Sequence, residues 1–259
     1  PDITFDCTTK VEHILRHHEV WPELAEAGCL FVVSAFESTN DDTLAILDKG
    51  HTVADMAAAI VVLRRHGIEI RPSFLPFTPW TSLDDLCDLV DFVAAHDLVG
   101  NVDAVQLTIR LLVPEGSLLV GHPAMAPWLG AYDQERLGFQ WTQADPRVDQ
   151  VQADVASLVE AAVARGEDSE VTFGRVRDAF YAASGRAPEV GVAVSSRSEG
   201  PPGPRARLTE AWFCCAEPTT GQLAGAAALP LGPDRQEMTE SAPAARWAPS
   251  PEGSISGSK

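Results

Sequence analysis

The stretch LFVVSAFESTNDDTLAILDKGHTVADMAAAIVVLRRHGIEIRPSFLPFTPW, residues 30–80, predicts a strand, two helices, a second strand and a Pro-rich loop. Residues 30–36 form an apolar run of strand length, which stops at the polar run 37–41. A second apolar run, residues 68–75, has the same length and follows the helices. Two strands joined by a helical crossover pair in parallel, so this stretch predicts a βαβ unit.

Both helices of this unit have end signals. Polar residues directly after Phe36 can cap the first helix, and Gly50 suits the backbone that follows its last turn. Thr52 with Asp55 matches the capping box at the start of the second helix, and Gly67 ends it.

Three further segments extend the same alternation. Residues 3–7 are strand-like and are followed by helical segments that end at Gly28. Ser82 and Asp85 start another helix, and residues 102–113 form an apolar, strand-like run before Pro114. The fold class is therefore α/β, a partial (βα) barrel of about four parallel strands. Four open strands would leave both sheet edges unpaired, so we expect an N-terminal part upstream of Pro1 to supply the rest.

Composition divides the chain into three parts. Residues 1–117 form the half barrel, and residues 118–185 form a helical extension that begins with an irregular segment of loop and short helix. Its helices start at the Asp145-Pro146 pair and near Thr172. Residues 186–259 are rich in Pro, Gly, Ser and Ala, and we expect them to be largely disordered.

Charge and hydropathy exclude several classes of partner. The chain has a net charge of −18, which argues against binding to the phosphate backbone of a nucleic acid. It contains no apolar run long enough to span a bilayer and no export signal. We therefore expect a cytoplasmic protein with neither a nucleic-acid nor a membrane partner.

Candidate site residues follow the predicted strands, because loops at the carboxyl ends of barrel strands converge on one face. Asp6, Glu37, residues 76–80 and Arg110 qualify by position. The structural alternative is that Asp6 and Glu37 are acids at helix starts and that Lys49 is a base at a helix end. Arg110 either meets a ligand or faces outward beside a helix and pairs with an acid.

The five cysteines show no metal-ligand spacing and no disulfide framework. The adjacent pair Cys214 and Cys215 stands apart, since one thiol can attack while the other resolves the product. Chance pairing in a disordered segment is the alternative, although it leaves the surrounding residues 212–218, WFCCAEP, unexplained.

Two sets of residues resemble a known family. The first set resembles the second half of a radical S-adenosylmethionine (SAM) barrel and comprises Glu37-Ser38, Leu44, Leu47, Lys49-Gly50, Thr52, Arg65, Gly67-Ile68 and Phe74-Leu75-Pro76. The second, WFCCAEP, resembles the signature of the CUAEP/CCAEP-tail radical SAM proteins, in some of which one cysteine is selenocysteine. Together the two cover about residues 1–222.

This resemblance implies an enzyme in which a reduced [4Fe-4S] cluster cleaves SAM to a 5′-deoxyadenosyl radical, which abstracts hydrogen from a small-molecule or peptide substrate. It implies that Glu37 contacts the SAM methionine or ribose and that Lys49 meets its carboxylate, with Asp6 and Arg110 as further cofactor-binding candidates. Cys214 and Cys215 would be catalytic, and a reductant protein would supply the electron.

The cluster motif of the family, CxxxCxxC, does not occur in this chain. The resemblance therefore implies cluster ligands outside this chain, which would be inactive alone. The alternative is a non-catalytic barrel remnant whose Cys-Cys tail is a binding or modified element.

Overall fold

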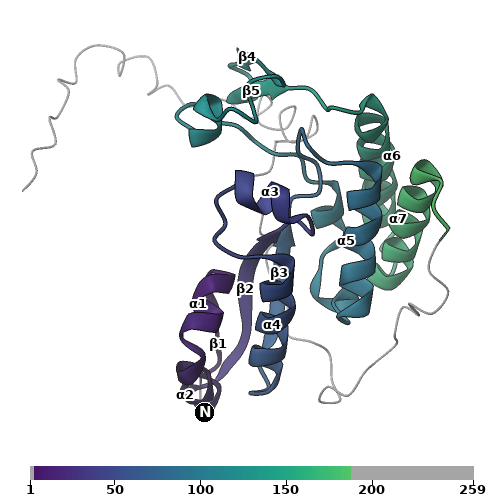
Figure 1. Cartoon of the computed structure of the whole chain (residues 1–259). Coiled ribbons are helices and arrows are strands. Elements are labelled where there is room, and N and C mark those ends of the chain that lie inside the picture. Colours follow the sequence, from purple (N-terminus) through teal and green to yellow (C-terminus); the bar gives the residue numbers. More distant parts are fainter. Residues whose placement is uncertain (1–2, 188–259) are drawn as a thin grey trace, which may run out of the picture. The chain divides into compact units, whose positions relative to one another are not determined.

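Three parallel strands form the main sheet of the computed structural model, which describes residues 3–187 (Figure 1). The middle strand, β2, pairs with β1 on one side and with β3 on the other. The elements in chain order are β1 (Phe5–Thr8), α1 (Val11–Arg16), η1 (His18–Val20), α2 (Trp21–Ala27), β2 (Cys29–Glu37), α3 (Asp41–Ile46), α4 (Val53–Arg64) and β3 (Glu69–Phe74). The predicted parallel α/β architecture is confirmed.

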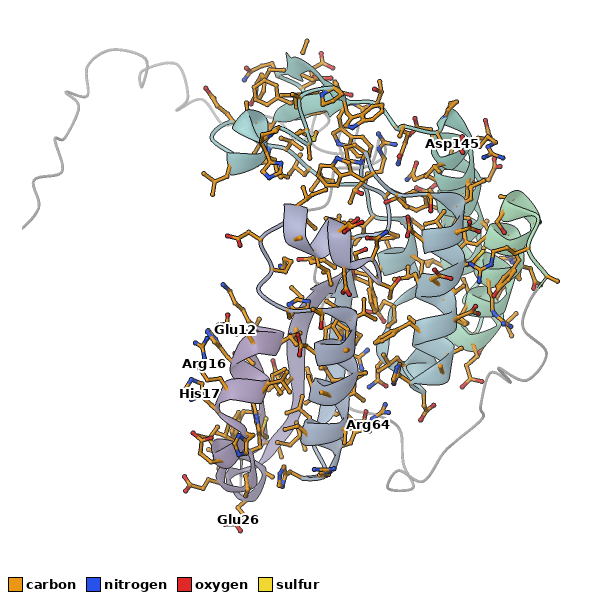
Figure 2. All side chains as sticks on the ribbon, in the orientation of Figure 1. Glu12, Arg16, His17, Glu26, Arg64 and Asp145 are labelled. Carbon is orange, nitrogen blue, oxygen red and sulfur yellow. The ribbon has the colours of Figure 1, made fainter. Side chains whose placement is uncertain are left out.

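Reciprocal side-chain to backbone hydrogen bonds begin the helices where the sequence predicted them. The Thr52 hydroxyl accepts from the Asp55 N–H and the Asp55 carboxylate accepts from the Thr52 N–H, which is a capping box at the start of α4. Ser82 and Asp85 repeat this arrangement at the start of α5 (Leu83–Ala95). Asp145 caps α6 (Pro146–Ala164), with proline in the first position (Figure 2).

Helices α5, α6 and α7 (Ser169–Ser184) share one core with the sheet. Figure 1 shows α7 beside α5, and α6 packs against α7. The cluster joins side chains from the strands and from all three helices, among them Phe36, Phe74, Leu86, Val155 and Phe180. Helices α6 and α7 of the predicted extension therefore share a core with the three-stranded sheet, and the boundary near residue 117 stays a prediction.

The two faces of the main sheet differ in character. Side chains alternate between the faces, and Val32, Phe36 and Ile70 lie on the face that packs against the helices. The opposite face is polar on both outer strands and carries Asp6 and Thr8 from β1 and Glu69, Arg71 and Ser73 from β3. The middle strand places Phe31 and Val33 on this second face, which is therefore polar at its edges and apolar at its centre.

The predicted fourth strand is wrong for most of its length. Residues 99–108 form two 3₁₀ helices, η2 (Val99–Asn101) and η3 (Ala104–Thr108). Bridge pairing remains at Arg110, which forms a parallel bridge to Phe77, and at Leu111. The apolar pattern reflects burial instead, because Leu107 packs into the main core while Ile109 and Leu111 enter a second cluster. A barrel of four strands is therefore not formed by the described residues.

A hairpin that the sequence did not indicate occupies the irregular segment. After η4 (Leu118–Gly121), strands β4 (Leu129–Asp133) and β5 (Gly138–Trp141) pair antiparallel. The Asp133 carboxylate accepts hydrogen bonds from two turn N–H groups, and the positive φ of 55° falls on Leu137. The turn therefore lacks the Asn-Gly or Asp-Gly pair by which hairpins are found in sequences.

The predicted disordered tail lies almost wholly outside the described residues, and with it Cys214, Cys215 and the WFCCAEP motif. Within residues 3–187, no helix combines the length and the apolar character needed to cross a bilayer.

Candidate functional site

Glu37 ends β2 in an unusual backbone conformation. Its φ is +65°, and the Ser38 N–H donates to the Phe36 carbonyl at 2.9 Å across it. An i to i+2 hydrogen bond with a positive central φ is typical of the rare, strained form of the γ-turn. The Leu75 N–H donates to the Glu37 carbonyl at 2.8 Å, which fixes this turn to the end of β3. Such strained residues concentrate at functional sites, which makes Glu37 the first candidate.

Lys49 reaches back to this strand end and pairs with Glu37. Its ammonium lies 2.9 Å from Glu37 Oε1, and the two side chains are 24% and 11% exposed. The turn after α3 directs it there, because Asp48 and Gly50 both have positive φ and the Lys49 N–H donates to the Leu44 carbonyl. The structure thus brings together two predicted cofactor-binding residues, and their role in binding stays a prediction.

His51 is a buried neighbour of this pair for which the sequence indicated no role. It is 8% exposed, its Nε2 lies 3.4 Å from the Phe36 carbonyl, and its Nδ1 has no hydrogen-bond partner. Burial lowers the pKa of His51, and the charge of Lys49 lowers it further, against the opposing effects of nearby carbonyls and Asp55. No pattern in the sequence could have found it, because its place depends on how the Lys49 turn folds onto β2.

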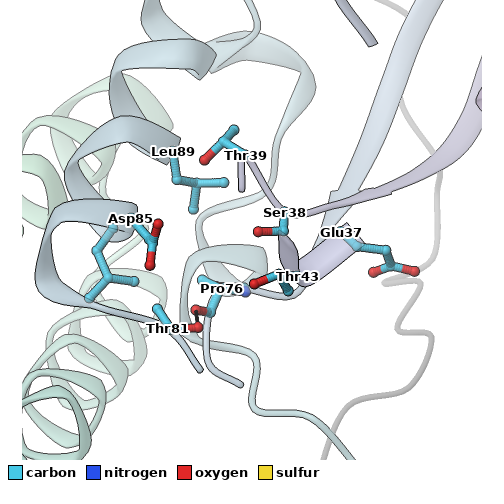
Figure 3. A pocket seen from close by; sticks show the side chains of 9 residues that line it. Glu37, Ser38, Thr39, Thr43, Pro76, Thr81, Asp85 and Leu89 are labelled. Atoms are coloured by element: carbon cyan, nitrogen blue, oxygen red, sulfur yellow. Dashed lines mark hydrogen bonds between the residues drawn. The ribbon is translucent and has the colours of Figure 1, made fainter. Parts of the chain in front are cut away.

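A small cavity lies behind Glu37, between the carboxyl ends of the strands and the start of α5. Its volume is about 10 Å³, which is room for about one water molecule. The Glu37 carboxylate points away from the other lining side chains (Figure 3). Asn40 ties the two helix starts together by donating to Asp85 Oδ1 at 2.8 Å. The lining residues are Glu37, Ser38, Thr39, Thr43, Pro76, Thr81, Asp85, Leu86 and Leu89. This cavity does not enclose a nucleotide-sized ligand.

The loop of residues 76–80 is fixed by its own hydrogen bonds. The Thr81 hydroxyl donates to the Pro76 carbonyl and accepts from the Thr78 N–H. Trp80 donates its indole N–H to the Ala124 carbonyl at 2.9 Å. Hydrogen bonds therefore fix this loop at the carboxyl end of β3, where the sequence predicted it.

Asp6 does not lie where the sequence placed it. It is exposed within β1 and pairs in register with Phe31, near the start of β2, whereas Glu37 ends that strand. The prediction that Asp6 and Glu37 share one rim is wrong. The strand-like segment at residues 3–7 placed Asp6 near its carboxyl end, but pairing with β2 continues to Thr8.

Arg110 contacts the hairpin and α6. Its guanidinium lies 4.1 Å from the centre of the Trp141 ring and forms an ion pair with Asp149 of α6. Of the two alternatives drawn from the sequence, these contacts match the pairing with an acid beside a helix. A role for Arg110 in cofactor binding stays a prediction.

A broad depression lies at the other end of the sheet, between the carboxyl ends of α4 and α5. Its volume is about 420 Å³, and Arg64 donates there to the carbonyls of His96 and Asp97. These bonds satisfy two carbonyl groups that directly follow the end of α5. None of the predicted site residues lines it.

The thiols of the described residues do not form a metal centre. Within residues 3–187, no group of three or more His, Cys, Asp or Glu side chains is arranged to hold a metal ion. Burial raises the pKa of Cys7 and Cys87, and it raises that of Cys29 to about 12. Burial therefore disfavours the thiolate form that binds iron.

No protein-family model and no curated protein matches the sequence. Among solved structures, the chain is similar to the cobalamin-dependent S-adenosylmethionine radical enzyme OxsB, both with aqua-cobalamin bound and with aqua-cobalamin and S-adenosylmethionine bound. Each similarity has a TM-score of 0.52 at 14% identity and covers 62% of this chain but only 29% of OxsB. The chain therefore has a fold related to that of a radical SAM enzyme and spans less than a third of that enzyme's length.

Proposed function

We propose that this chain is part of a radical SAM enzyme in which Glu37 and Lys49 bind the methionyl head group of SAM. The observation that supports this most directly is the partly buried Glu37–Lys49 ion pair at the carboxyl end of β2. Carboxyl ends of parallel strands are where ligands bind in folds of this type. OxsB, whose fold is similar, was solved with SAM bound. SAM carries an ammonium and a carboxylate, which are opposite in charge to Glu37 and Lys49.

In this proposal each side chain binds one polar group of SAM. The Glu37 carboxylate accepts from the α-ammonium or the ribose diol, and the Lys49 ammonium donates to the α-carboxylate. The γ-turn at Glu37 and the turn that carries Lys49 hold the backbones of both residues in place before the ligand arrives. Asp6 is left out of this contact, because its register places it at the far end of β2.

When bound, SAM and a reduced [4Fe-4S] cluster supply a 5′-deoxyadenosyl radical. The described residues do not fit the cluster, since Cys7, Cys29 and Cys87 form no ligand group and burial disfavours their thiolates. Because the whole sequence also contains no CxxxCxxC motif, the proposal assigns the cluster ligands to polypeptide outside this chain and the electron to a reductant protein. What residues 3–187 contribute is the binding and orientation of SAM.

SAM affinity in the 259-residue chain tests the assignment. Glu37→Gln and Lys49→Met each remove a charge-assisted hydrogen bond worth about 1.5–3 kcal/mol, so the Kd should rise by about 10- to 150-fold in each. Arg175→Met is the matched control, because it breaks an ion pair of similar length with Glu167 near the start of α7. Isothermal titration calorimetry measures all four proteins. Unchanged SAM affinity in both site variants would show that Glu37 and Lys49 have a purely structural role.

A non-catalytic barrel remnant is the second candidate, and the small cavity behind Glu37 favours it. The discriminating measurement is 5′-deoxyadenosine formation from SAM under anaerobic reduction, in the full-length protein that contains this chain. Formation of 5′-deoxyadenosine supports the enzyme. SAM binding without 5′-deoxyadenosine supports the remnant.

A further inference from the structure

The Glu37–Lys49 pair satisfies itself in the ligand-free chain. Both side chains are mostly shielded from water, and each provides the other with an opposite charge at 2.9 Å. A further carboxylate at this loop belongs to Glu12, whose Oε2 lies 3.3 Å from where a Cβ on Gly50 would be. That carboxylate is already engaged by Arg16 on α1. A ligand at this strand end must therefore compete with an ion pair that is complete.

The number of charges left unpaired after this competition depends on the ligand. A ligand with one ammonium and one carboxylate on neighbouring atoms replaces both halves of the pair, and every shielded charge keeps an opposite partner. A ligand with a single charge displaces one half and leaves the other shielded and unpaired. Breaking one partner of a buried pair is strongly unfavourable, so such a ligand is disfavoured by more than its one missing contact.

We propose, on the basis of the SAM site above, that the Glu37–Lys49 ion pair takes the place of the ligand when the site is empty. The pair separates only when an α-amino-acid zwitterion binds. Selectivity for both charges then resides in the pair itself. The backbone supports this exchange, because the turns at Glu37 and Asp48–Gly50 are fixed by hydrogen bonds that do not use either charged group. The two side chains can separate while their backbones stay in place.

The test compares ligands that differ by one charge. The probes are SAM, its carboxyl methyl ester and its analogue without the α-amino group, together with L-methionine and L-methionine methyl ester. The proteins are the wild-type chain, Lys49→Met, Glu37→Gln, Lys49→Arg as the conservative variant and Arg175→Met as the control. Circular dichroism checks that each variant keeps its fold.

The expected result is a reversal of preference. The wild-type chain and Lys49→Arg should bind SAM about tenfold or more tightly than either single-charge analogue. Lys49→Met leaves a lone carboxylate and should bind the ester at least as tightly as SAM. Glu37→Gln should show the opposite preference, for the analogue without the amino group. Arg175→Met should match the wild type.

Other outcomes separate this inference from the proposed function. If SAM binds and each substitution weakens all three adenosyl ligands by the same factor, the exchange is overturned and SAM binding stands. If L-methionine and its ester show the reversal while SAM does not bind, the zwitterion site stands and the SAM assignment falls. If the wild-type chain binds neither zwitterion, both are overturned.

Discussion

The guanidinium of Arg110 lies 4.1 Å from the centre of the Trp141 indole ring and pairs with the Asp149 carboxylate. The indole N–H of Trp141 in turn donates to the Leu111 carbonyl at 2.7 Å. These contacts join the short parallel bridge, the hairpin and the start of α6. Arg110 therefore holds three elements together at a point where the predicted fourth strand is nearly absent.

Replacing Arg110 tests whether it is structural or ligand-binding. Arg110→Met should lower the free energy of unfolding by about 1–3 kcal/mol, because it removes the ion pair and the stacking on Trp141. Arg147→Met, which breaks an exposed ion pair with Asp145, should change it by less than about 1 kcal/mol. Urea unfolding measures both. A loss of SAM affinity in Arg110→Met at wild-type stability would favour the cofactor role instead.

The positive φ of Glu37 gives a second prediction, which compares glycine and alanine at one position. Both substitutions remove the ion pair with Lys49, so the difference between them isolates the backbone. Glycine adopts a positive φ without the steric penalty of a Cβ. Glu37→Gly should therefore be about 1–2 kcal/mol more stable than Glu37→Ala in urea unfolding. Equal stabilities would show that the turn at Glu37 is unstrained.

Much of this site was predictable because its signals are local. Thr52 with Asp55 and Ser82 with Asp85 begin helices by hydrogen bonds within a few residues, and the sequence alone specifies such pairs. The end of β2 follows from the change from apolar to polar residues at Glu37. The positions of β2 and of the turn after α3 then bring Lys49 close to Glu37.

The parts that could not be predicted depend on contacts between distant segments. Most apolar residues of 102–113 are buried as expected, but they lie in 3₁₀ helices and a second cluster, and periodicity cannot distinguish these from a strand. Asp6 was misplaced because the register between β1 and β2 is set by pairing, not by β1 itself. His51 was missed because a buried imidazole is recognised only after the fold is known.

The third prediction concerns acid stability and His51. Burial lowers the pKa of His51 in the folded chain, so between that pKa and its ordinary value near 6.5 the unfolded chain binds more protons. The free energy of unfolding therefore rises with pH through this window and decreases as the pH falls. For one proton, this slope is at most about 1.4 kcal/mol per pH unit. His51→Gln should flatten this dependence.

His96 provides the matched comparison for this experiment. Burial also lowers its pKa, and Arg64 adds to the effect. His96→Gln should flatten the same window, and the double variant should flatten it more than either alone. Urea unfolding at a series of pH values between 5 and 7.5 measures the slopes. A wild-type slope in all three variants would mean that neither imidazole changes its proton affinity on folding.

The last prediction concerns Cys214 and Cys215, which lie outside the described residues and whose role stays a prediction from the sequence. If one sulfur reacts and the other resolves the product, diamide oxidation of the wild-type chain should give a disulfide within the pair. The two thiols lose their hydrogens and diamide is reduced to the hydrazine. Because the thiols are adjacent, this internal capture should outrun attack by an added thiol such as glutathione.

Single substitutions should remove the internal route and leave the first reaction intact. Cys214→Ser and Cys215→Ser should each accumulate a glutathione mixed disulfide at the remaining cysteine, and Cys214→Ser/Cys215→Ser should form neither product. Intact-mass and peptide mass spectrometry distinguish a loss of two hydrogens from a glutathione adduct. SAM affinity should be the same in all four proteins, since Glu37 and Lys49 are untouched. As much glutathione adduct on the wild-type pair as on the single variants would show that neither cysteine resolves the other.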